Sequence, residues 1–208
     1  MQKIFFTLLT VFLLSACGGQ KSVVKKYYMI EQPGAKIEPS EKTGEAIDAW
    51  CEVSEVELYP AFEGRKIVFR DASHQIRYFG NHEWAVRPAK VLTPVIKDYL
   101  SAHKIFTRVS TRFWERSPDY QLNTTIFNLE VGNAEGKKDI FEAHLKLRFE
   151  LIDTQTDTIA VWHTADRQSV LEDRNLNQLA ATISKMFHEE LENFATKTKE
   201  VLVKPKNN

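Results

Sequence analysis

Apolar and polar residues alternate most regularly between positions 140 and 152. From 141 to 151 every second side chain is apolar, and those between are charged or histidine. Because successive side chains of a strand point to opposite faces, this pattern predicts a strand with one buried and one solvent-facing side. The polar residues 153–157 predict a turn, after which residues 158–164 return as the antiparallel partner strand.

Two other segments carry apolar side chains at the helical spacing of three and four residues. The first helix is expected to begin at Glu83 or Pro88 and to end near Ala102. Pro94 is expected to bend it, because proline removes an internal hydrogen bond. The second helix is expected over residues 175–199, where its apolar stripe covers one face of a sheet.

The remaining periodic segments are shorter and predict strands at residues 27–30, 47–59, 66–70, 75–79 and 120–131. Residues 31–46 carry proline, glycine and charge without periodicity and predict a loop. Together, the predicted strands and helices indicate a single α+β domain over residues 27–203, with a tail at 204–208. In this two-layer domain a mostly antiparallel or mixed sheet has two main helices on one face.

The amino terminus has a different pattern. Lys3 precedes an uninterrupted, mostly apolar stretch at residues 4–16, which is too short for a membrane-spanning helix of about 20 residues. A basic start, a short apolar run and small residues at its end are typical of a secretory signal peptide. We therefore expect residues 1–16 to be removed.

Cys17 ends the sequence Leu-Ser-Ala-Cys, the lipobox pattern of bacterial lipoproteins. Its thiol is the expected site of acylation, with residues 17–26 as a tether. The alternative is an ordinary signal peptide with an incidental cysteine. Gly18, in place of the aspartate that retains lipoproteins in the inner membrane, favours the periplasmic face of the outer membrane.

Composition narrows the function classes. The 28 basic and 28 acidic residues balance, and no basic stripe indicates nucleic-acid binding. With Cys17 acylated, Cys51 has no intrachain disulfide partner, and its apolar neighbours predict a small buried side chain. The four tryptophans are expected to be core anchors, although a lipid-facing role for one or two stays open.

The sequence shows no legible catalytic machinery. The six histidines lack the spacing of metal ligands, and neither a phosphate-binding glycine loop nor a nucleophile elbow occurs. His144 and His163 are expected to meet across the two paired strands as a surface pair. We therefore predict that the protein is not an enzyme and uses no cofactor or metal.

Three short motifs carry a resemblance to a known family. They are the pair Tyr27-Tyr28 after the tether, the segment Val56–Arg70, and the pair Trp84-Ala85 before an apolar helix. In this order they resemble the PqiC-type auxiliary lipoproteins of ABC-type transport systems, across essentially the whole mature chain. Two positions depart from the family pattern: Tyr59 separates leucine from proline, and Glu63 replaces an expected leucine.

The resemblance implies an outer-membrane lipoprotein that works with an inner-membrane permease and ATPase and with a periplasmic MCE-type protein to move lipids between membranes. The alternative is a structural or regulatory envelope lipoprotein that binds cell-wall machinery. A homo-oligomer is possible in either case. The candidate partner-binding residues are Tyr59, Pro60 and Phe62, unless Tyr59 and Phe62 fold back onto the core.

Overall fold

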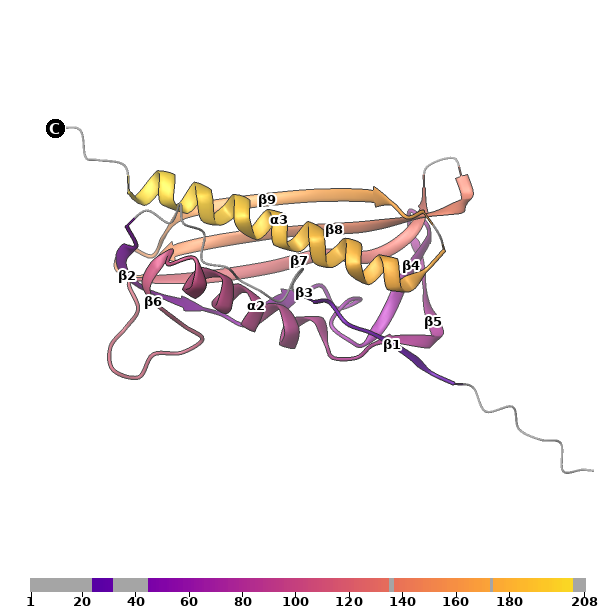
Figure 1. The fold of residues 1–208 in the computed structure, drawn as a ribbon, viewed down its shortest axis with the longest axis horizontal. Coiled ribbons are helices and arrows are strands. Elements are labelled where there is room, and N and C mark those ends of the chain that lie inside the picture. The colour runs from indigo at the N-terminus through magenta and orange to yellow at the C-terminus, as the bar shows by residue number, and fades with distance from the viewer. Residues whose placement is uncertain (1–23, 32–44, 135–136, 173, 204–208) are drawn as a thin grey trace, which may run out of the picture.

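A nine-stranded mixed sheet with two helices on one of its faces forms the fold of the computed structural model (Figure 1). The structure describes residues 24–31, 45–134, 137–172 and 174–203. The strands are β1 (Lys26–Tyr28), β2 (Ile47–Val53), β3 (Glu57–Leu58), β4 (Lys66–Ala72), β5 (Gln75–Trp84), β6 (Phe106–Ser110), β7 (Tyr120–Ala134), β8 (Lys137–Asp153) and β9 (Thr158–Val170). The helices are α2 (Pro88–Ala102) and α3 (Leu176–Leu202). This arrangement confirms the predicted α+β class.

The long strand β7 organises the sheet. On one side β8 pairs with it antiparallel, and β9 continues from β8. On the other side β2, β3 and β4 lie in succession along β7, all parallel to it. The sheet therefore splits into two branches, β2–β6 at one end of β7 and β4–β5–β1 at the other.

The core lies between the sheet and the helices. On β8 the predicted apolar face is confirmed, since the side chains at alternate positions from Ala143 to Leu151 are buried. Phe149 is central: its ring centroid lies 5.1 Å from that of Phe194 and 6.0 Å from that of Phe187, both on α3. The apolar stripe of α3 thus covers β8 and β9, while α2 covers β6 and β2.

Helix α2 begins at Pro88, one of the two predicted starts. It continues through Pro94 to Ala102, and the bend at this proline stays a prediction. Thr93, the residue directly before Pro94, is buried and connects α2 to the sheet layer. Its hydroxyl donates to the carbonyl of Ala89 and accepts from the N–H of Val56, over 2.8 and 2.9 Å.

Several strands differ from the prediction. Strand β5 runs to Trp84, beyond its expected end at residue 79. The expected strand 47–59 is two strands, because residues 54–56 leave the ladder and Val56 bonds to α2 instead. Strand β6 was missed, because its sequence Phe-Thr-Arg-Val-Ser is short and only its first residue is buried. Strand β9 runs to Val170, beyond the predicted end at residue 164.

Candidate partner-docking surface

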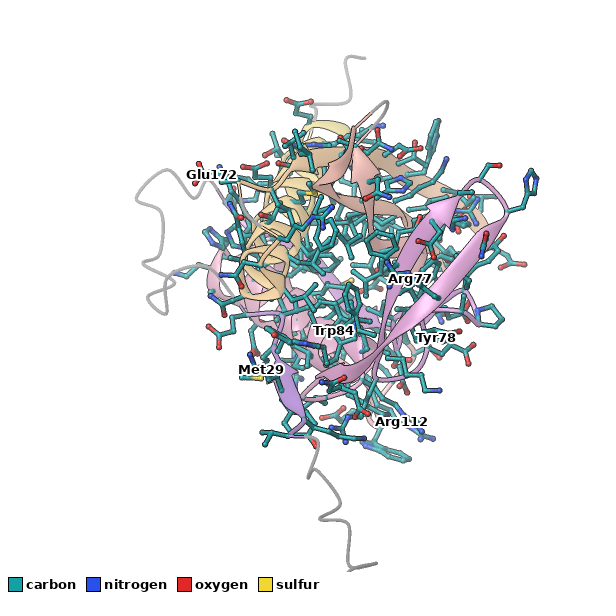
Figure 2. All side chains as sticks on the ribbon, turned by 90° about the vertical axis from the view of Figure 1, so that its right-hand side faces the viewer. Met29, Arg77, Tyr78, Trp84, Arg112 and Glu172 are labelled. Carbon is teal, nitrogen blue, oxygen red and sulfur yellow. The ribbon has the colours of Figure 1, made fainter. Side chains whose placement is uncertain are left out.

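The sheet face turned away from the helices, here called the open face, is lined by polar and aromatic side chains. On β8 it receives the residues that alternate with the buried ones, among them His144 and Arg148. On β7 it receives Glu130, which pairs with His144 in the ladder. In Figure 2, seen along the molecule, the helices lie to one side of the sheet and leave this face uncovered.

One aromatic patch on the open face consists of Tyr59, Pro60, Phe127 and Arg148. Tyr59 is 53% exposed, and its ring centroid lies 5.4 Å from that of Phe127. The Arg148 guanidinium lies 5.5 Å from the centre of the Phe127 ring. The backbone N–H of Tyr59 donates to the carbonyl of Ile126 over 3.0 Å, which fixes the start of this turn against β7. Exposed aromatic rings beside arginine are typical of protein–protein contacts.

The third predicted partner-binding residue lies elsewhere. Phe62 is only 4% exposed and belongs to the hydrophobic core. Its N–H donates to the carbonyl of Tyr59 over 2.8 Å, and this turn directs the Phe62 ring inward while Tyr59 stays outside. The expectation is therefore corrected for Phe62. A docking role stays a prediction for Tyr59 and for Pro60, which is also exposed.

A charged cluster occupies the other end of the open face. The Glu130 carboxylate is buried and accepts from the Arg70 Nε over 2.7 Å and from the Asn128 Nδ2 over 2.9 Å. The Nδ1 of His144 lies 3.3 Å from the same oxygen, and its Nε2 lies 2.8 Å from Asp166. His144 is thus held between two carboxylates.

These contacts shift the pKa values of Glu130 and His144. Burial alone would raise the pKa of Glu130, but hydrogen bonds from His144 and Arg70 outweigh burial and hold the pKa below its ordinary value. The hydrogen bond to Glu130 raises the pKa of His144, burial opposes it, and Asp166 raises it further. The second oxygen of Glu130 is buried without a hydrogen-bond partner in the described part of the chain.

His163 lies on the opposite face from His144, so the predicted histidine pair was wrong. The ladder places Gln168 beside His144 and Phe149 beside His163. The Nε2 of His163 lies 2.8 Å from the buried carboxylate of Glu190 on α3. This contact joins α3 to β9.

The tryptophans divide between core and surface. Trp84 is buried, as expected of a core anchor. Trp114 and Trp162 are 79% and 56% exposed, which corrects the expectation for these two. Trp50 contacts two guanidinium groups, those of Arg108 at 4.2 Å and Arg116 at 4.3 Å from the centre of its ring.

The two cysteines have different places. Cys17 and the rest of the predicted signal peptide lie outside the described residues. Cys51 is fully buried, and burial raises the pKa of its thiol, which fits the predicted role as a small core side chain. Within the described ranges no three or more His, Cys, Asp or Glu side chains are arranged so that they could hold a metal ion. Neither helix described is long and apolar enough to span a bilayer.

Comparison with known proteins gives the family. A family model described as the ABC-type transport auxiliary lipoprotein component matches residues 28–195. The crystal structure of protein XCC0632 from Xanthomonas campestris is similar with a TM-score of 0.66 and 12% identity, over 86% of this chain and 94% of that one. A second structure, of an uncharacterized protein, has a TM-score of 0.58 and 14% identity, over 83% and 98% of the two chains.

Among curated protein sequences none matches. At identities of 12% and 14% the two structures show a shared fold alone. The family model, in contrast, covers most of the chain, from the end of β1 to the last turns of α3. The protein belongs to the family of ABC-type transport auxiliary lipoprotein components.

Proposed function

We propose that this protein is a non-catalytic, outer-membrane lipoprotein that serves an ABC/MCE-type system for lipid transport between membranes. The observation that carries the proposal is the aromatic patch: in a chain of a transport-auxiliary family, Tyr59 is 53% exposed on the sheet face opposite the two helices that the structure describes. Exposed aromatic groups of this kind are the usual centres of binding energy in protein interfaces.

The anchor explains why a partner is needed. With Cys17 acylated, the nine residues from Gly18 to Lys26 span at most about 30 Å even when fully extended. The domain therefore stays close to its own membrane. We infer that a periplasmic MCE-type protein, connected to the permease and ATPase of the inner membrane, comes to the open face.

We propose a non-catalytic role because of the way in which the buried carboxylates are held. Glu130 and Glu190 are both buried and held by arginine and histidine. We infer that these carboxylates serve to hold the strands and α3 together and take no part in catalysis.

Crosslinking in the intact envelope tests the proposal. A photo-reactive amino acid is placed at position 59 and, as the matched control, at position 27, because Tyr27 is also 53% exposed but lies on β1. The proposal expects an MCE-type protein to be captured from position 59 and not from position 27. Capture of a cell-wall synthase instead would support the alternative role, and equal capture from both positions would contradict a docking patch at Tyr59.

A further inference from the structure

A second unusual surface lies at the far end of the β2–β6 branch, on the loop between β6 and β7. Here a pocket of about 600 Å³ is lined by Lys104, Arg108, Arg112, Phe113 and Trp114, among others. We call it the Trp114 pocket. Trp114 is the most exposed large hydrophobic side chain described, at 79%. The Arg112 guanidinium lies 4.0 Å from the centre of its ring.

The charges of the pocket are unbalanced. Lys104 and Arg112 make no ion pair within the described ranges, and Arg108 forms a long ion pair with Glu115, at 3.8 Å. Three cations against the one carboxylate of Glu115 leave the pocket with excess positive charge, which favours an anionic occupant. Tryptophan and arginine together suit the boundary between headgroups and acyl chains, where the ring is half immersed and the cation meets phosphate.

The position of the pocket indicates which anion it meets. In Figure 1 the β6–β7 loop hangs from the lower left of the molecule, and the described chain enters β1 at the lower right. Figure 2, turned by 90°, again places Arg112 at the lower edge, the side of the molecule on which β1 also lies, while Figure 1 separates the two along the long axis. One edge of the domain thus carries both the Trp114 pocket and the point where the tether joins β1.

We propose that the Trp114 pocket binds the phosphate headgroups of anionic phospholipids in the membrane that carries the acyl anchor. The domain then rests on the bilayer along this edge, held by the acyl chains at one end and by Trp114 and the basic side chains at the other. The open face stands away from this edge and is left free for a protein partner. The inference rests on acylation of Cys17, which belongs to the proposed function, but not on lipid transport.

Depth-dependent quenching tests this contact. The full acylated chain is placed in vesicles of phosphatidylcholine with phosphatidylglycerol. An apolar aromatic fluorophore, which takes the place of the indole ring, is attached in the Trp114→Cys or the Trp162→Cys variant. Trp162 is the matched control, since it is an exposed tryptophan on β9, at the upper edge in Figure 1. Cys17 is blocked by its acyl group and Cys51 is fully buried, so the label reaches only the introduced site.

Lipids that carry a spin label on the headgroup should quench the fluorophore several-fold more at position 114 than at position 162. Each cation near an anionic surface contributes about fivefold to its occupancy there. Omitting phosphatidylglycerol, or introducing Lys104→Glu together with Arg112→Glu, should therefore reduce quenching at position 114 towards that at 162. Circular dichroism checks that the variants are folded.

Three outcomes overturn the proposal. They are equal quenching at both positions, quenching at position 114 that does not depend on phosphatidylglycerol, and the same fluorescence change with inorganic phosphate alone. The last would identify a small-anion pocket and no bilayer contact. Mass measurement of the purified chain before reconstitution shows whether Cys17 is acylated, so that loss of the anchor and failure of the pocket are told apart.

Discussion

His144 and Glu130 lie side by side on β8 and β7, with 3.3 Å between the histidine Nδ1 and a carboxylate oxygen that is almost fully buried. We expect this pair to make the stability of the folded protein depend on pH. A raised pKa of His144 means that its protonated form is favoured by folding. This stabilisation is complete below about pH 6.5, the ordinary histidine value, and is lost as pH rises through the raised value.

The free energy of unfolding should therefore decline with rising pH above neutrality, and His144→Gln should flatten that decline. Urea unfolding at a series of pH values measures both slopes. The control is His103→Gln, at the residue that caps the carboxyl end of α2, because burial and the nearby His188 lower the pKa of His103. Its contribution has the opposite sign, being lost as pH falls. Identical slopes for His144→Gln and the wild type would contradict the role of the pair.

Phe149→Ala tests the core between sheet and helix. Phe149 is fully buried and contacts two phenylalanines of α3, so its truncation should cost about 3–5 kcal/mol of the free energy of unfolding. Denaturant unfolding measures the loss. Trp162→Ala, at an exposed position on β9, should stay within about 0.5 kcal/mol of the wild type. Comparable losses for the two variants would mean that the two faces of β8 and β9 are assigned wrongly.

Thr93→Val tests the link between α2 and the segment that separates β2 from β3. Valine keeps the shape of threonine but leaves the buried N–H of Val56 without its acceptor, at a cost of about 1–3 kcal/mol. Ser101→Ala is the control, because the Ser101 hydroxyl bonds only to a carbonyl of its own helix, that of Lys97. The prediction fails if thermal unfolding shows Thr93→Val to be as stable as Ser101→Ala.

Cys17→Ser tests the anchor. The variant should accumulate as a precursor that incorporates no labelled palmitate, because serine lacks the thiol that accepts the lipid. Cys51→Ser should be labelled like the wild type, since Cys51 is buried in the core. Normal labelling of Cys17→Ser would exclude the lipoprotein assignment of this residue.

The elements that sequence patterns predicted well are those with one buried and one polar side. Strand β8 and helices α2 and α3 each carry a mostly apolar stripe against the core, so periodicity alone locates them. The second half of β9 has no such stripe. Arg167 there faces α3 and binds Glu189 and Glu190, so a charged residue occupies a helix-facing position. Periodicity could not have shown this.

The candidate site was only partly predictable for a related reason. The cluster of aromatic residues at 59–62 marked a turn between strands, but its sequence does not say which ring turns inward. That choice depends on the hydrogen bond from Phe62 to Tyr59 and on the position of β7 beneath it. Phe127 and Arg148 complete the aromatic patch from strands distant in sequence, and only the strand register brings them to Tyr59.

The central claim is that this lipoprotein docks on a transport complex through its open face. The most direct measurement is quantitative mass spectrometry of proteins that co-purify with the acylated chain from native envelopes, for the wild type, Tyr59→Asp and the control Tyr27→Asp. Burying an unpaired carboxylate in an aromatic contact is unfavourable, so Tyr59→Asp should lose most of the bound partner. The account predicts that MCE-type, permease and ATPase subunits co-purify with the wild type and Tyr27→Asp and are depleted at least tenfold, about 1.4 kcal/mol, with Tyr59→Asp. Absence of these subunits from the wild-type sample, or their undiminished recovery with Tyr59→Asp, would contradict it.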